Sequence, residues 1–236
     1  MPMGEEIRSS PAVAQIGCRW DPQDSAVIAV ARSLHLVESR GERSCAVSDL
    51  AHLPRGLLSL EQWDALELDP TRRWELSEGT LIMSPRPQLW HQRISKRLTR
   101  LLDDHLPDGL EAIPEIEVIT RASFPPSVRD PDIVVVPDRV FEGRPARVPA
   151  ADVLLVVEIV SPGSRGTDHV MKLHEYAKAG IENYWIIDPD GPADDRFLAY
   201  RLDGESYRRV TALDGDRVRV NEPTNMEFAL DQLTGR

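Results

Sequence analysis

The sequence predicts a mixed α/β fold, with helices flanking a β-sheet and antiparallel strands near the C-terminal end. Residues 132–136 and 153–160 are aliphatic, largely β-branched runs, which are typical of strands buried on both faces of a sheet. A helical pattern over 167–179 separates the second run from another apolar strand at 183–187, which predicts a strand-helix-strand crossover. Asp-Gly turns divide the last part of the chain into alternating segments, as expected of antiparallel strands.

The elements before the first buried strand follow from local signals. Ser59, with Gln62 three residues later, forms a capping-box pattern that predicts the start of a helix. The segments on either side of Ser77-Glu78-Gly79 are strand-like, which predicts a hairpin. The predicted elements are, in order, a helix ending near Pro70, hairpin strands at 73–76 and 80–83, a helix over 88–105, and a strand over 113–120.

The second half begins with the two buried strands and the crossover helix. Gly180 follows that helix directly and is expected to be its C-cap, because glycine adopts the left-handed conformation without strain. Tyr176 lies on the same predicted helix and is expected to pack in the core. The antiparallel strands of the tail are predicted over 196–202, 207–213 and 217–220.

The chain divides into an N-terminal extension, residues 1–56, and a folded domain, residues 57–236. The extension is rich in Ala, Ser and Arg, and it has one amphipathic segment but nothing that resembles a strand. We therefore expect a poorly structured extension that is loosely attached to the domain.

Composition narrows the class of protein. The chain has 236 residues, of which 41% are hydrophobic and 28% charged, so it can form an ordinary core. Its net charge of −11 argues against a general nucleic-acid coat, but it is compatible with a nuclease whose acidic site gathers metal ions. The two cysteines have no metal-ligand spacing, and the N-terminus does not resemble a signal peptide. The sequence also has no apolar run long enough to span a membrane. These features predict a cytoplasmic protein with no membrane partner.

Two carboxylates interrupt the buried strands. Asp132 adjoins the run Ile133–Val136, and Glu158 lies within the run 153–160. A buried carboxylate costs several kcal/mol, in order of magnitude, unless it is paired or binds a metal. Carboxylates on neighbouring strands can share Mg²⁺, a hard ion that prefers oxygen ligands. The alternative is a pair of strand-end carboxylates satisfied by arginine or by main-chain amides.

The order of several motifs resembles the Uma-type family of bacterial restriction endonucleases, within the PD-(D/E)XK nuclease superfamily. The resemblance runs from about Leu57 to the C-terminus. The motifs are Trp74-Glu75-Leu76-x-x-Gly79, Met83-Ser84-Pro85, His91, Pro131-Asp132, Glu158-Ile159-Val160-Ser161-Pro162-Gly163-Ser164-Arg165, Asp168-x-x-x-Lys172-x-x-x-Tyr176-x-x-x-Gly180 and Tyr184-Trp185-Ile186-Ile187-Asp188-Pro189.

This resemblance implies a restriction-endonuclease-like core in which Asp132 and Glu158 are catalytic residues that bind the metal. Val160 stands where the superfamily usually has lysine, two residues after the glutamate, and Lys172 on the following helix fits the place of a relocated catalytic lysine. An ammonium there could orient the attacking water or neutralise the transition state. The alternative for Lys172 is an ordinary pair with Asp168, four residues earlier.

Further residues are candidates for accessory and DNA-binding roles. Glu75 could complete the metal shell or form a salt bridge with an arginine such as Arg73, and His91 could contact phosphate or water or be structural. The helix over 88–105 carries a basic stripe that would bind DNA or form a solvated face. This basic stripe comprises Arg93, Lys96, Arg97 and Arg100.

The function predicted from these residues is metal-dependent hydrolysis of DNA phosphodiester bonds, with Mg²⁺ or Mn²⁺ as the cofactor. One rival is a nuclease-like DNA-binding or regulatory protein with a degenerate site, since a fold does not determine a function. Another is a hydrolase of a smaller phosphoester. Cleavage of both strands of DNA would suit a two-fold homodimer.

Overall fold

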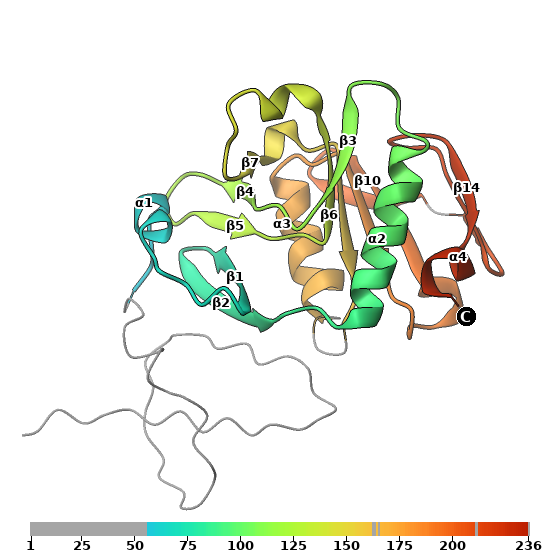
Figure 1. Ribbon diagram of the computed structural model, residues 1–236, viewed down its shortest axis with the longest axis horizontal. Helices are drawn as coiled ribbons and strands as arrows, with labels where there is room; N and C mark the ends of the chain where they lie inside the picture. Colours follow the sequence, from blue (N-terminus) through green and yellow to red (C-terminus); the bar gives the residue numbers. More distant parts are fainter. Residues whose placement is uncertain (1–55, 162–163, 165, 211, 236) are drawn as a thin grey trace, which may run out of the picture.

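The computed structural model describes residues 56–161, 164, 166–210 and 212–235 (Figure 1). The predicted extension over residues 1–56 lies outside this part except for Gly56, so its character stays a prediction. Within the described part, no helix has the length and apolar character needed to cross a bilayer.

A six-stranded mixed sheet forms the centre of the fold, with the strand order β11-β10-β9-β8-β6-β3. Only β8 and β9 run parallel, and every other neighbouring pair is antiparallel. The sheet comprises β3 (Leu110–Pro114), β6 (Ile133–Pro137), β8 (Leu155–Ile159), β9 (Asn183–Ile187), β10 (Phe197–Asp203) and β11 (Ser206–Arg209). The predicted buried strands β6 and β8 are therefore adjacent at its centre.

The crossover from β8 to β9 confirms the predicted strand-helix-strand unit. Its helix begins as a π-helix, η4 (Thr167–Lys172), and continues as the α-helix α3 (Leu173–Lys178). Gly180 follows with a φ of +80°, the left-handed conformation expected of a C-cap glycine. Wider π-helical turns are uncommon and often occur at functional sites.

Helices cover both faces of the six-stranded sheet. The helix α2 (Leu89–Asp103) buries Ile94 and Leu98 in a cluster that includes Val135 and Val157. On the other face, Tyr176 of α3 packs in the cluster that contains Val134 and Val156. Near α2 lie a three-stranded antiparallel sheet and a short helix, namely β12 (Ala212–Asp214), β13 (Arg217–Val220), β14 (Met226–Ala229) and α4 (Leu230–Thr234) (Figure 1).

A second, five-stranded sheet has the order β2-β1-β5-β4-β7. The predicted capping box is present at the first helix, since Gln62 N–H donates to Ser59 Oγ and Ser59 N–H to Gln62 Oε1. This part comprises α1 (Leu60–Asp64), β1 (Arg72–Ser77), β2 (Thr80–Pro85), β4 (Val118–Arg121), β5 (Ser127–Arg129) and β7 (Val148–Pro149). Short 3₁₀ turns are η2 (Asp138–Phe141), η3 (Ala150–Asp152) and η5 (Ala193–Asp195).

Two predicted strands are wrong as continuous elements. The strand predicted over 113–120 is divided into β3 and β4, which belong to different sheets. Glu115, with a φ of +54°, and the preceding Pro114 turn the chain between them. The strand predicted over 207–213 is likewise divided into β11 and β12. The elements β5, β7, β14 and α4 were not predicted, because segments of two to five residues have little periodicity of their own.

Candidate active site

Asp132 and Glu158 lie opposite each other at one end of the central strand pair. Residues Ile133 and Val157 are partners in the antiparallel register of β6 and β8, and one further step sets Asp132 opposite Glu158. Both side chains are buried, with 2% and 3% of their surface exposed. Opposed side chains on antiparallel strands share a face, so the two predicted carboxylates converge.

Asp132 is held by three hydrogen-bonding partners. Arg73 Nη1 donates to Oδ1 at 2.7 Å, Ile159 N–H donates to Oδ2 at 2.6 Å, and His91 Nε2 lies 3.0 Å from Oδ2. Burial by itself would raise the pKa of Asp132, but the Arg73 charge and the other two partners outweigh it and hold the pKa well below its ordinary value. Asp132 is therefore ionised.

Glu158 has a different environment. Lys172 Nζ donates to its Oε1 at 2.9 Å, and the Tyr176 hydroxyl donates to the same oxygen at 2.7 Å. Burial, together with the charge of nearby carboxylates, raises the pKa of Glu158 to about 8 despite the Lys172 ammonium. Both donors bind the same oxygen, and no described residue donates a hydrogen bond to Glu158 Oε2.

Lys172 is surrounded by carboxylates. Its Nζ lies 3.4 Å from Glu75 Oε1 and 3.5 Å from Asp168 Oδ1, in addition to the contact with Glu158, and 7% of the residue is exposed. Burial would lower the pKa of Lys172, but the surrounding negative charge raises it above its ordinary value. The pair with Asp168 is present as one of three contacts, so Lys172 is both buried and paired.

Glu75 extends the cluster to the second sheet. Its Oε2 accepts from Arg129 Nη1 at 3.1 Å, and its Oε1 accepts from the Asp130 N–H at 3.2 Å. The charges of Lys172 and Arg129 overcome the effect of burial and lower the pKa of Glu75 to about 2. Of the two predicted alternatives, the salt bridge to an arginine is present, although the partner is Arg129 and not Arg73, and the role of Glu75 in a metal shell stays a prediction.

His91 connects α2 to the ends of the central strands. The residue is 4% exposed, and its Nε2 lies 3.0 Å from the main-chain oxygen of Ile159 as well as 3.0 Å from Asp132. Its Nδ1 is buried without a hydrogen-bond partner among the described residues. His91 thus lies at the predicted site, where it orients Asp132.

Four side chains of this cluster were not assigned to the site from sequence. They are Arg73, Arg129, Asp168 and the hydroxyl of Tyr176. Tyr176 is buried in the core as predicted, although its hydroxyl also reaches Glu158. The alternation of charged Arg73 and Glu75 with apolar neighbours on β1 could have indicated one polar face. Nothing local distinguishes Arg129, because its partners lie far away in sequence.

The charge of the cluster suits a hard divalent cation. Among the described residues, its carboxylates outnumber its permanent cations; the carboxylates are Glu75, Asp130, Asp132, Glu158, Asp168 and Glu175, and the cations are Arg73, Arg129 and Lys172. Oxygen donors and excess negative charge fit Mg²⁺ or Mn²⁺. Within the described ranges, no three Asp, Glu, His or Cys side chains are already arranged around a common metal position. An ion bound by Asp132 would therefore share it with Arg73 and His91, or displace them.

The basic stripe lies apart from the carboxylates. Arg93, Lys96 and Arg100 are exposed on α2, on the side that helical spacing places away from His91. Arg97 is half-buried, and its Nη1 donates to the main-chain oxygens of Gln232 and Leu233 at 3.0 and 3.2 Å. Arg97 consequently binds the last carbonyls of α4, where a cation is favoured.

Comparisons with known proteins agree with this fold. Residues 60–232 match the sequence model of the Uma2 family, described as "Putative restriction endonuclease". A similar solved structure is a putative nuclease belonging to DUF820 from Anabaena variabilis, with 20% identity, a TM-score of 0.58, and coverage of 75% of this chain and 98% of that chain. At this identity the likeness establishes the fold, and the predicted fold class is confirmed. No curated protein sequence matched significantly.

Replacement of Tyr176 by phenylalanine tests the contact with Glu158. The ring would still fill its place in the core, but buried Glu158 would lose a donor, at a cost of about 1–3 kcal/mol. We expect the melting temperature to fall by several degrees, at about 2–4 °C per kcal/mol. Tyr200→Phe is the control, because the Tyr200 ring packs against Tyr184 as the Tyr176 ring does, whereas of these two residues only Tyr176 donates its hydroxyl to Glu158. Equal melting temperatures for both variants would contradict the assignment.

Proposed function

This chain belongs to the Uma2 family of putative restriction endonucleases, and on that premise we propose that it is a metal-dependent endonuclease that hydrolyses DNA phosphodiester bonds. The main support is the buried cluster, in which Glu75, Asp132, Glu158 and Lys172 meet from two sheets and the crossover helix. Several ionisable side chains with perturbed pKa values in one place are characteristic of active sites.

Asp132 and Glu158 would hold the ion, with Glu75 as an accessory carboxylate. When bound, Mg²⁺ or Mn²⁺ supplies a water of lowered pKa and positive charge for the phosphoryl oxygen. The position of Asp132 opposite Glu158 on neighbouring strands and the lowered pKa of Asp132 support this assignment. A cation at this position would also offset the burial and the repulsion between carboxylates that together raise the pKa of Glu158.

The protein's own groups would position the reactants. The Lys172 ammonium binds Glu158 Oε1 and places a compact positive charge beside the carboxylates, where it can orient the attacking water or offset charge on the phosphate. The Tyr176 hydroxyl restrains the same carboxylate, whereas Arg73 and His91 restrain Asp132. Such restraint keeps catalytic groups in place without reorganisation during the reaction.

A second function is favoured by the pairing of the cluster's charged side chains with one another. Lys172 is buried and paired, and both oxygens of Asp132 already accept hydrogen bonds. Together with Val160 in place of the usual lysine, this arrangement would suit a nuclease-like protein that binds DNA without efficient cleavage.

A cleavage assay separates the two functions. Plasmid and single-stranded DNA are incubated with the full chain in Mg²⁺ or Mn²⁺, with Asp132→Ala as the matched variant, and products are resolved on gels. We expect cleavage only with a divalent ion, and a loss of activity in Asp132→Ala because one metal ligand is removed. DNA binding without cleavage under either ion would favour the second function.

Replacement of Lys172 tests the relocated lysine. Lys172→Ala leaves buried carboxylates less neutralised, so we expect reduced stability as well as a fall in turnover of about 10²-fold or more. Lys172→Arg should restore little turnover, because a planar guanidinium does not reproduce a compact ammonium.

Single-turnover rates are measured at a temperature where circular dichroism shows that both Lys172 variants are folded. Metal binding through Asp132 and Glu158 is followed by calorimetry and should persist. Unchanged cleavage together with a lower melting temperature would mean that Lys172 is structural.

Charge reversal tests the basic stripe. Lys96→Glu combined with Arg100→Glu should weaken DNA binding and reduce the slope of binding against salt concentration, because fewer counterions are released. Binding is measured by fluorescence anisotropy over a range of salt concentrations. Arg139→Glu with Arg208→Glu is the control, since both arginines are exposed on other elements. The same effect in both double variants would assign only a general electrostatic role to the stripe.

A further inference from the structure

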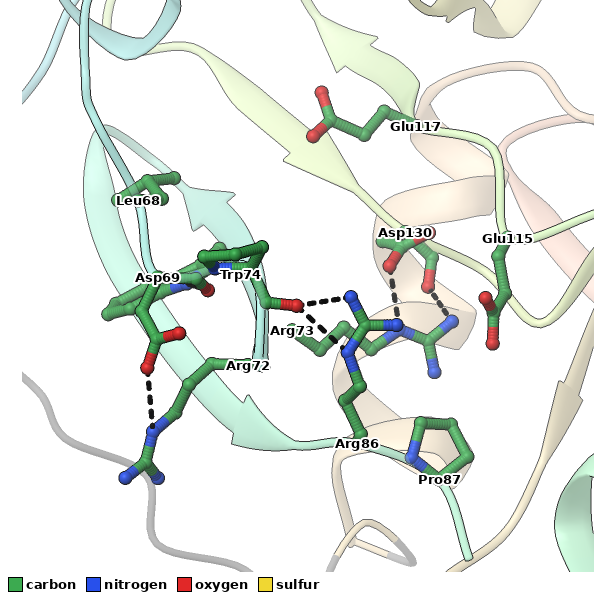
Figure 2. A pocket seen from close by; sticks show the side chains of 11 residues that line it. Leu68, Asp69, Arg72, Arg73, Trp74, Arg86, Pro87, Glu115, Glu117 and Asp130 are labelled. Atoms are coloured by element: carbon green, nitrogen blue, oxygen red, sulfur yellow. Dashed lines mark hydrogen bonds and ion pairs between the residues drawn. The ribbon is translucent and has the colours of Figure 1, made fainter. Parts of the chain in front are cut away.

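A surface pocket adjoins the buried carboxylate cluster. Its volume is about 270 Å³, and it is formed by β1, the residues around β2, and the segment between β3 and β4. Arg73 and Asp130 belong to both the pocket wall and the cluster, because Arg73 Nε donates to Asp130 Oδ2 at 2.8 Å while Nη1 binds Asp132. Figure 2 shows these two residues between Trp74 and Glu115. A ligand in this pocket would thus lie one side chain away from Asp132.

The pocket wall offers both hydrogen-bond donors and acceptors. Arg86 is exposed, and its guanidinium binds the main-chain oxygen of Pro70 through Nε at 3.0 Å and also through Nη2, while Nη1 has no partner among the described residues. Glu115 is also exposed, and its Oε1 accepts from Gln92 Nε2 at 2.6 Å. No described residue donates to Glu115 Oε2, so a ligand could bind one arginine and one carboxylate together.

One aromatic residue, Trp74, is among those that line the pocket. Its ring packs in part against the apolar cluster that contains Leu76 and Val128, and the indole Nε1 donates to the main-chain oxygen of Asp69 at 2.9 Å, which restrains the ring. Aromatic side chains are common platforms for planar heterocycles, since every nucleobase has a π-face that can stack. Guanidinium and carboxylate groups pair with the hydrogen-bonding edges of bases.

A phosphate group fits this wall poorly. Four carboxylates line the pocket together with three arginines; the acids are Asp69, Glu115, Glu117 and Asp130, and the bases are Arg72, Arg73 and Arg86. A negatively charged ligand would therefore be repelled as well as attracted, whereas a neutral ring with donors and acceptors would be matched. The volume also lies just below the ~300–1,000 Å³ typical of sites for drug-sized molecules, as suits a smaller ligand.

We propose that this pocket binds one unstacked nucleobase of the nucleic acid strand whose phosphodiester lies at the carboxylate cluster. The inference rests on the proposed function for the position of the scissile bond, and it adds a subsite for the base. Enzymes that act on nucleic acids can take a base out of the stack and bind it by edge hydrogen bonds and stacking. The pocket would thereby favour single-stranded or locally unpaired substrates, and it would contribute to sequence preference through Arg86 and Glu115.

The test compares the removal of a base from the oligonucleotide with the replacement of a pocket residue in the protein, and then combines the two changes. Binding of a short single-stranded oligonucleotide for each of the four bases is compared with binding of an abasic backbone of equal length and charge. The proteins are the full chain, Arg86→Ala, Glu115→Gln and the distant control Arg208→Ala. Fluorescence anisotropy is measured in EDTA, so that the result is independent of cleavage.

For at least one base, Arg86→Ala should raise the Kd by about tenfold, while it should change the Kd of the abasic backbone less than about twofold. Glu115→Gln should show the same pattern and alter which base is preferred, whereas Arg208→Ala should change neither Kd. Such non-additivity indicates direct contact between the base and the pocket.

Other outcomes overturn the inference. An equal effect of Arg86→Ala on natural and abasic strands would mean that the pocket binds phosphate. If Arg86→Ala changes the Kd of neither strand, or if the protein binds no oligonucleotide, the pocket binds no part of the strand. Cleavage combined with additive effects would leave the proposed function intact without the base subsite. Non-additive binding without cleavage in Mg²⁺ or Mn²⁺ would retain the subsite and reject the nuclease function.

Discussion

The ammonium of Lys172 lies among three buried carboxylates, and this cation joins the two larger sheets to the crossover helix. Glu75 belongs to the five-stranded sheet, Glu158 to the six-stranded sheet, and Asp168 to the π-helical turn that also carries Lys172. Removal of one partner from a buried ionic cluster leaves uncompensated charge, which is strongly destabilising. The positions of η4, β8 and the hairpin β1–β2 relative to one another thus depend on the same condition, which is that the charges of Lys172 and its carboxylate partners stay paired.

The same requirement connects stability with the proposed chemistry. Arg73 neutralises Asp132 and His91 orients it, but the described residues of the cluster include more carboxylates than permanent cations. Metal binding at Asp132 and Glu158 would relieve this excess, so the ion would stabilise the folded state as well as supply the reaction. Arg73 would also mediate between the carboxylates and the neighbouring pocket, because its guanidinium contacts Asp132 and Asp130 at once. Substrate binding and metal binding would then be coupled through a single side chain.

Much of the fold is predictable because its central strands have strong local signals. The runs that became β6, β8 and β9 are apolar on both faces, and the crossover between β8 and β9 follows from a helix placed between them. The apolar spacing of α2 and the capping box at Ser59 were equally clear. Prediction failed where one segment serves two sheets, as at 113–120, because a left-handed turn at Glu115 separates β3 from β4 and such a conformation of a glutamate has no clear sequence signal.

The sequence by itself indicated that Asp132 and Glu158 would be buried, since both belong to apolar strands, and it indicated the family through the order of its motifs. Only the tertiary structure decided their partners. Arg129 is fully buried, yet its partners Glu75 and Glu175 lie 54 and 46 positions away from it in the chain. Hydrophobic periodicity records how each segment faces the core, whereas a buried ion pair depends on the distance between segments that only packing brings together.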